Sequence, residues 1–273
     1  MLAHLSRALP AARSIPAARK TVRAMATIKG GTVPGEMHKV TFGNNLPGYV
    51  CGDKGAPAVI VLQMSQDARS CDWWGVVPTI VDHALRLSQE GYRCLVPDLY
   101  KGKVGVDKEE ASHLLSKLDW VAAVDEIKQA VEFLRSEGAP KVGAIGFCMG
   151  GALTLCAAQH AGIDAANPFY GLPGPEICQP ENIKVPVYLH HGALDDMKGF
   201  SDPESAKAFA DKINAAGGDA KLFVYEGSGH GFLNIGEEAL AKRAHMGFPE
   251  PPASAQELAW SRVLELFGRT LKA

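Results

Sequence analysis

Short apolar segments alternate with longer amphipathic segments from residue 36 onward, and this alternation most constrains how the chain can fold. Residues 57–63 are apolar up to the final glutamine, as expected of a strand buried on both faces. Residues 76–90 place their apolar side chains on one side of a helix, which Gly91 would end. The pattern predicts a mostly parallel sheet with helices on both faces. Since no internal repeat or long linker interrupts it, we expect one doubly wound α/β domain over residues 36–273.

The same reading places the individual elements. The expected strands cover residues 37–41, 46–51, 57–63, 92–96, 141–146, 165–170, 185–190 and 220–225. The expected helices cover residues 76–90, 107–137 with a break near 118–119, 149–159, 203–215 and 254–271. Residues 64–72 and 171–182 follow neither periodicity, and we expect them to form loops beside the sheet.

A cysteine stands at the tightest predicted connection of the chain. The segment Gly146-Phe147-Cys148-Met149-Gly150 follows a predicted strand and opens a predicted helix. This is the context of a nucleophile elbow, where a strained central residue points away from the sheet and flanking glycines avoid collisions. The start of a helix also favours a thiolate and a developing oxyanion. A structural turn with a buried cysteine is the alternative, but the strand before it and the helix after it favour a nucleophile.

A thiol nucleophile needs a nearby base, and His230 is the best-placed histidine. It lies in a glycine-rich loop directly after the predicted strand 220–225, at the carboxyl end where ligands meet an open α/β sheet. His190 and His191 are adjacent on a predicted strand, so they face opposite sides and cannot chelate an ion together. We therefore predict that His230 is the base and expect no metal site.

The base needs an acid that holds its tautomer, and that acid should follow the preceding strand. Asp195 and Asp196 both stand just beyond the predicted strand 185–190, and the spacing from Gly192 favours Asp195. Asp196 stays the alternative. The order nucleophile, acid, histidine is that of α/β-hydrolases, so we expect an α/β-hydrolase fold.

Composition excludes several other classes of protein. The formal net charge of -2 and the pI near 6.5 give no electrostatic reason to expect binding to nucleic acid or to an acidic membrane. No apolar run approaches the roughly 18 residues that span a bilayer. The 6 cysteines form no C-x-x-C pair, so neither a zinc site nor a dithiol motif is visible and we expect reduced thiols. We expect a monomer whose only partner is a small molecule.

Residues 1–35 differ in composition from the rest of the chain. They are rich in alanine and carry no acidic residue, while their basic residues are Arg7, Arg13, Arg19, Lys20, Arg23 and Lys29. This composition is typical of an organellar transit peptide, and a disordered tail is the alternative. The low serine content favours a mitochondrion, whereas the ending Val22-Arg23-Ala24 favours a chloroplast, so the organelle stays open. Without such a peptide, the protein would be cytoplasmic.

These segments together resemble the dienelactone hydrolase family over residues 37–271. The matching pieces, in family order, are Val96-Pro-Asp-Leu-Tyr100, Gly146-Phe-Cys-Met-Gly-Gly151, Gly192-Ala-Leu-Asp195 and Gly229-His-Gly-Phe232. The resemblance implies a Cys148–His230–Asp195 triad, an acyl-thioester intermediate and no cofactor. It also implies hydrolysis of small esters or lactones, as by a carboxymethylenebutenolidase.

The chain departs from the family in the segment where members have a glutamate that contacts the resting thiol. The residues of this chain that correspond to that segment are Gln63 and Asp72, and residues 64–71 separate them. If Asp72 takes that role, the backbone N–H groups of Trp73 and Met149 would form the oxyanion hole. The alternative is that Asp72 merely opens the next helix. Whether residues 64–71 are a genuine insertion stays open.

A second departure concerns the substrate. Family members that cleave dienelactone hold its carboxylate with arginines, and one of those positions is Asn234 here. Because a charge-assisted clamp is lost, we expect weak binding of an anionic lactone. Trp73 and Trp74 suggest an apolar acyl or aryl group, and we place Trp74, Asn234 and Phe232 in the substrate pocket.

Two other functions remain compatible with the sequence. A thiol at a helix N-terminus oxidises readily, so Cys148 could belong to a weakly active or inactive family member that senses redox state or binds a ligand. An enzyme acting on acyl-thioesters would share the same triad. Turnover of an ester at neutral pH separates the hydrolase from the sensor.

Overall fold

The computed structural model describes residues 21–23, 27–28, 31–32, 36–63, 78–99, 119–234, 240–241, 244 and 249–273. Its main sheet has nine strands in the order β1-β4-β5-β7-β6-β8-β9-β10-β11. These strands are β1 (Thr21–Arg23), β4 (Glu36–Phe42), β5 (Leu46–Cys51), β6 (Ala58–Leu62), β7 (Arg93–Pro97), β8 (Val142–Phe147), β9 (Ala165–Phe169), β10 (Val187–Gly192) and β11 (Ala220–Tyr225). Strands β2 (Thr27–Ile28) and β3 (Gly31–Thr32) form a separate antiparallel pair.

Five α-helices accompany the sheet in the described ranges, together with one short 3-10 helix. The α-helices are α1 (Pro78–Gln89), α3 (Trp120–Ser136), α4 (Met149–His160), α5 (Pro203–Ala215) and α7 (Ala253–Leu271), and the 3-10 helix is η1 (Pro180–Asn182). Among these elements, no helix is both long and apolar enough to span a bilayer.

The sheet changes from antiparallel to parallel along its width. The pairs β1–β4, β4–β5 and β5–β7 are antiparallel, and every pair from β7–β6 to β10–β11 is parallel. The strands predicted at 37–41 and 46–51 are found as β4 and β5, which form an antiparallel hairpin with Asn45 in the turn at φ 61°. From β6 the chain crosses to β7 on one side and later to β8 on the other. The carboxyl ends of β6 and β8 therefore form the switch point at which open α/β sheets bind ligands.

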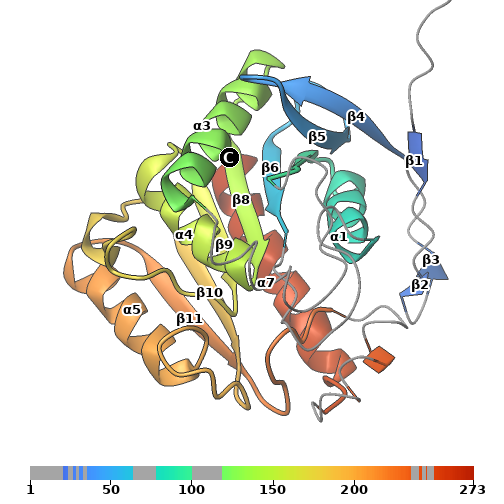
Figure 1. Ribbon diagram of the computed structural model, residues 1–273. Coiled ribbons are helices and arrows are strands. Elements are labelled where there is room, and N and C mark those ends of the chain that lie inside the picture. The colour runs from blue at the N-terminus through green and yellow to red at the C-terminus, as the bar shows by residue number, and fades with distance from the viewer. Residues whose placement is uncertain are drawn as a thin grey trace, which may run out of the picture.

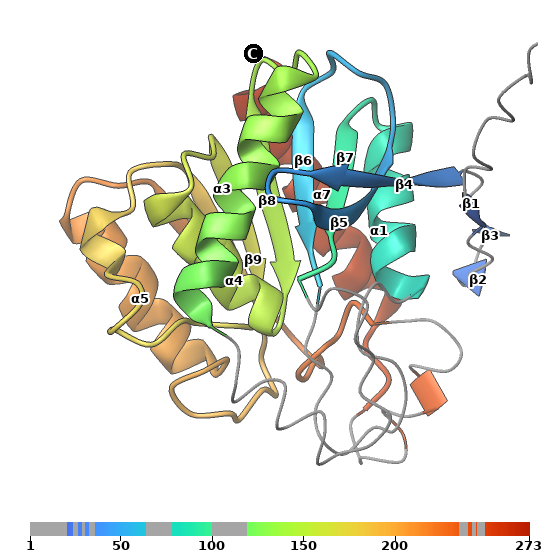
Figure 2. The same ribbon diagram turned by 45° about the horizontal axis from the view of Figure 1, so that its top comes forward.

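Helices cover both faces of the sheet, as the alternating pattern predicts (Figure 1). Helices α3, α4 and α5 contribute to one hydrophobic cluster, and α1 and α7 contribute to the other. Figure 2 shows α3 in front of the central strands and α7 behind them. Strands β6 and β8 are buried along their whole length, which explains why they carry no polar alternation.

Local sequence signals account for most element boundaries. Helix α3 begins after Asp119, whose side chain accepts from the N–H of Ala122 at 3.0 Å, and this start agrees with the predicted boundary near 118–119. Helix α5 begins with the N-cap Asp202 followed by Pro203. Strand β10 starts later than predicted because Pro186 has no N–H to give to the ladder.

Some predicted features lie outside the described residues. These are the loop 64–72, the helical stretch 107–118 and most of the proposed transit peptide. Within residues 1–35, β1 pairs with β4 at the edge of the sheet.

A buried ion pair fixes the end of the sheet opposite the switch point. The Arg93 guanidinium donates to both carboxylate oxygens of Glu137 at 2.9 and 3.1 Å, and its third donor reaches the carbonyl of Gly52 at 2.7 Å. The two side chains are only 7% and 8% exposed. One arginine therefore ties β7 both to the C-terminal end of α3 and to the residue that follows β5.

We expect Glu137→Gln to lower the free energy of unfolding by about 3 kcal/mol, because it leaves the buried Arg93 charge without its counterion. The matched control is Asp211→Asn, which breaks the exposed pair of Lys207 and Asp211 and should change stability by less than about 1 kcal/mol. Urea unfolding followed by circular dichroism measures both. Equal losses in the two variants would contradict a structural role for the Arg93–Glu137 pair.

Candidate active site

Cys148 occupies a strained turn between β8 and α4. Its backbone has φ 56° and ψ -118°, a combination that L-residues rarely adopt. The turn is held by three hydrogen bonds: the Cys148 N–H donates to the carbonyl of Phe169 at 3.0 Å, and its carbonyl accepts from Gly151 and Ala152 at 2.8 and 3.1 Å. The sulfur is therefore presented at the start of α4, as a nucleophile elbow requires.

Glycines make the close approaches around this turn possible. A methyl group on Gly146 would collide with the carbonyl of Gly150, and one on Gly150 would stand 2.5 Å from the carbonyl of Leu62 in β6. A methyl group on Gly171 would collide with the carbonyl of Cys148 itself. The flanking glycines thus have the steric role predicted for them, and Gly171 is a further one that the motif does not include.

His230 lies between Cys148 and Asp195. Its Nε2 is 3.3 Å from Cys148 Sγ, and its Nδ1 is 2.8 Å from Asp195 Oδ2. The imidazole is 13% exposed and the Asp195 carboxylate 1%. His230 follows β11, Cys148 follows β8 and Asp195 follows β10. The carboxyl ends of these parallel strands therefore bring the three residues together, although 82 residues separate His230 from Cys148.

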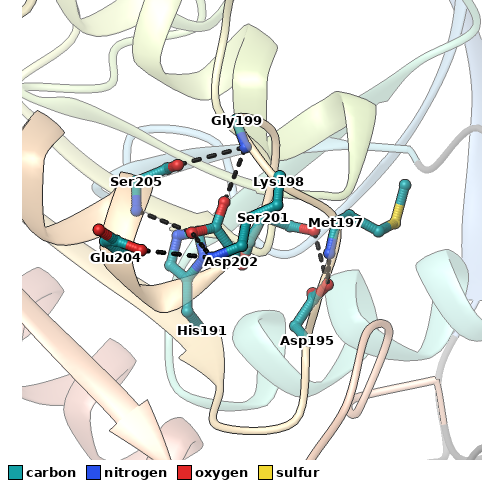
Figure 3. A network of polar contacts seen from close by, with 9 residues as sticks. All are labelled: His191, Asp195, Met197, Lys198, Gly199, Ser201, Asp202, Glu204 and Ser205. Carbon is teal, nitrogen blue, oxygen red and sulfur yellow. Dashed lines mark hydrogen bonds and ion pairs between the residues drawn. The ribbon is translucent and has the colours of Figure 1, made fainter.

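The second carboxylate oxygen of Asp195 is held as well (Figure 3). Oδ1 accepts from the hydroxyl of Ser201 at 2.8 Å and from the N–H of Met197 at 3.4 Å. Asp196, the alternative acid, has an exposed side chain. The geometry therefore places Asp195, and not its neighbour, against the imidazole.

Charge and burial act in opposite directions on His230. Burial alone would lower its pKa, but the charge and hydrogen-bond effects of Cys148 and Asp195 outweigh it and raise the pKa to about 10. The pKa of Asp195 is lowered, since hydrogen bonds from His230, Ser201 and Met197 outweigh the opposing effect of burial. The imidazole therefore lies between two groups that favour its positive charge.

Aromatic rings surround this imidazole. The ring of Tyr170 meets His230 edge-on with centroids 5.1 Å apart, and Phe200 lies at 6.2 Å. Tyr170 follows β9 directly, has φ 36° and is fully buried. Its strained backbone at the carboxyl end of a strand indicates that Tyr170 belongs to the site. In the sequence, only the predicted end of the strand at residue 170 pointed to this residue.

The other predicted site residues have different outcomes. Met149 is the first residue of α4, where a helix directs N–H groups outward, as the predicted oxyanion hole needs. Asn234 is half-buried, and its amide oxygen accepts from Thr79 in α1 at 3.2 Å. Phe232 is 0% exposed and packs on the rings of Phe169, Tyr170 and Tyr225, and its place in the substrate pocket stays a prediction. Asp72, Trp73 and Trp74 lie outside the described residues.

Sequence reasoning missed Ser201. The Asp202-Pro203 signature predicts where α5 begins, but the contact of Ser201 with Asp195 spans a loop of irregular backbone. No periodicity in the sequence indicates such a contact.

The two strand histidines do face opposite sides: His190 stacks on Phe169, whereas His191 bonds to the carbonyl of Ser201. In the part of the chain that the structure describes, no cluster of three metal-ligating side chains occurs.

Comparisons with known proteins show a likeness that covers most of the chain. The model of the dienelactone hydrolase family matches residues 46–271. Protein usf of Aquifex pyrophilus is 33% identical over 239 residues, covering 82% of this chain and 94% of that protein. The carboxymethylenebutenolidase of Pseudomonas putida is 24% identical over 215 residues, covering 72% and 86%. A dienelactone hydrolase-like promiscuous phosphotriesterase from metagenomic libraries superposes with a TM-score of 0.70 at 24% identity, covering 85% and 97%, and this likeness supports the fold.

We expect the His230 imidazole to titrate near pH 10 in the wild-type protein and well below that in Cys148→Ala, because the Coulombic effect of Cys148 is the largest influence that raises the pKa of His230. Nuclear magnetic resonance of the labelled imidazole measures both midpoints. Cys156→Ala removes another buried thiol of α4 and serves as the control that should leave the midpoint unchanged. An identical midpoint in wild type and Cys148→Ala would contradict the ion pair.

Proposed function

This chain belongs to the dienelactone hydrolase family, and on that premise we propose that it hydrolyses small esters or lactones through an acyl-thioester on Cys148. The observation that carries the proposal is the position of His230, with one ring nitrogen 3.3 Å from Cys148 Sγ and the other 2.8 Å from Asp195 Oδ2. A thiol, a base and an orienting acid in this geometry are the parts of nucleophilic acyl transfer.

The first half of the reaction transfers the acyl group to sulfur. The Cys148 thiolate attacks the carbonyl carbon, and the resulting oxyanion is stabilised at the N-terminus of α4, where the Met149 N–H is a donor. The imidazolium of His230 then donates its Nε2 proton to the leaving oxygen as the carbon–oxygen bond breaks. An alcohol departs, or the ring opens if the substrate is a lactone.

The second half returns the thiolate. His230, now neutral, takes a proton from water while the water oxygen attacks the thioester carbon. The carbon–sulfur bond breaks, the acid product leaves, and the thiolate and imidazolium are restored. Asp195 holds the imidazole in one orientation throughout and favours its charged form.

We propose neutral esters and lactones as the substrates. A carboxylate-bearing lactone needs a cation to hold it, and the family resemblance places Asn234 where dienelactone-cleaving members have an arginine. The amide of Asn234 is already engaged with Thr79, which ties the His230 loop to α1. This contact supports a positioning role for Asn234 in place of a charged clamp.

We expect p-nitrophenyl acetate to give a burst of product followed by steady turnover with the wild-type chain, and neither phase with Cys148→Ala or His230→Ala. Intact-mass measurement after acid quenching should show one acetyl group on the wild-type protein only. Asp195→Asn should lower kcat by about 10²–10⁴-fold, because the imidazole loses its orienting partner. Asp196→Asn is the matched control and should stay within about twofold of wild type. Equal rates in wild type and Cys148→Ala would contradict the mechanism and direct attention to peroxide oxidation of the thiol.

We also propose that the protein is a monomer and that residues 1–35 direct it into a mitochondrion or a chloroplast. The support for import is compositional: basic residues and alanines precede the first acidic residue, Glu36. We expect the radiolabelled full-length chain to be imported by one type of isolated organelle and shortened near Ala24. A chain lacking residues 1–24 should not enter. Import of neither chain by either organelle would indicate a cytoplasmic protein.

A further inference from the structure

We propose that Ser201 is a positioning residue of this hydrolase: its hydroxyl fixes the Asp195 carboxylate and shares the Nδ1 proton of His230. The proposal rests on the function proposed above, since Ser201 touches neither the nucleophile nor the substrate carbonyl. It adds a fourth side chain to a site that sequence motifs assign to three.

The hydroxyl of Ser201 makes two contacts within the triad. It lies 2.8 Å from Asp195 Oδ1 and 3.2 Å from His230 Nδ1. A hydroxyl has a single proton. Because the carboxylate can only accept, that proton goes to Asp195, and the serine oxygen accepts from the imidazole N–H. The His230 proton is therefore shared between Asp195 Oδ2 and Ser201 Oγ.

The rest of the loop holds Ser201 in place (Figure 3). Its carbonyl accepts from His191 Nδ1 at 2.7 Å, and its N–H donates to the carbonyl of Met197 at 3.0 Å. Burial lowers the pKa of His191, so the ring is neutral and its one proton is on Nδ1, the nitrogen that must donate. Ser201 is itself 0% exposed.

Helix α5 anchors the other end of this loop. The adjacent residue Asp202 is the N-cap of α5, and its side chain accepts from Ser205 N at 3.0 Å and Gly199 N at 2.7 Å. Residues 197–202 are thus joined to helix α5 through Asp202 and to strand β10 through the bond between His191 and Ser201. The serine hydroxyl is presented by a rigid turn, as a positioning group requires.

This arrangement determines which carboxylate oxygen faces the imidazole. If Oδ1 lost its hydroxyl donor, the carboxylate could rotate, and Oδ2 would no longer be held toward Nδ1. The imidazolium would then be less favoured, and with it the thiolate at Cys148. The effect falls on chemistry and leaves substrate binding unchanged.

The test compares Ser201→Ala with Ser228→Ala in the full-length chain, using p-nitrophenyl acetate. Ser228 is also 0% exposed and lies in the His230 loop, but its hydroxyl has no partner among the described residues. We expect Ser201→Ala to lower kcat about tenfold to a hundredfold, the range for a lost hydrogen bond to a charged group. KM should stay within about twofold, and Ser228→Ala should match wild type in both.

Two further measurements separate positioning from general damage. Alkylation of Cys148 by iodoacetamide at pH 6.5, followed by peptide mass spectrometry, should slow at least about threefold in Ser201→Ala and stay unchanged in Ser228→Ala. In an Asp195→Asn background, Ser201→Ala should lower kcat by a smaller factor than in the wild type, because the carboxylate that its hydroxyl orients is already lost and only its contact with His230 Nδ1 remains.

The outcomes distinguish the two proposals. If Cys148→Ala abolishes hydrolysis but Ser201→Ala behaves like Ser228→Ala, the positioning role is wrong and the hydrolase stands. Additive losses of Ser201→Ala and Asp195→Asn would also overturn the positioning role. If Cys148→Ala retains full activity, the proposed mechanism is wrong, and the alkylation rates still report whether Ser201 acts on the thiol.

Discussion

The backbone strain at Cys148 is the constraint around which the rest of the site is arranged. A residue held in this conformation carries a free-energy cost of order 1–3 kcal/mol, which the surrounding contacts must offset. Here the compensation comes from the carbonyl of Phe169 at one side and from the first N–H groups of α4 at the other. Strands β8 and β9 and helix α4 must therefore be fully formed and closely packed before the sulfur can be presented.

The packing of α4 follows from the same constraint. Its first turn lies so close to β6 and β9 that side chains on Gly150 and Gly151 would meet backbone carbonyls. Most of the helix is buried between α3 and the sheet. Small residues in its first turn and apolar residues beyond are the composition that such a position requires. The elbow and the central layer of the protein are one structural unit.

Electrostatics complete the site. Two acidic groups flank His230, so its charged form persists although burial opposes it. A thiol gives up its proton to a neighbouring imidazole more readily than a serine hydroxyl does. Such a nucleophile suits carbonyls with good leaving groups. In the proposed mechanism, the imidazolium of His230 supplies the proton to the leaving oxygen, so no acid has to come from solvent.

Much of this could be predicted from the sequence, because the signals are local. The strand, elbow and helix around Cys148 lie within one short segment, and Asp119 and Pro203 mark helix starts by their own chemistry. What could not be predicted depends on tertiary packing. Phe232 stands two residues from His230 in sequence, yet its ring turns inward against Tyr225 and Tyr170. Ser201 meets Asp195 only because His191 and the start of α5 close the loop between them.

The distribution of the triad over three parallel strands has a consequence for the nascent chain. The histidine that contacts Cys148 is distant in sequence: His230 is 82 residues further along, and its partner Asp195 lies between the two. During synthesis or refolding, the thiol therefore stays without its imidazolium until β10 and β11 have added to the sheet. The reactive nucleophile is thus a late product of folding, and incompletely folded chains carry an ordinary cysteine that is poorly suited to attack on surrounding metabolites.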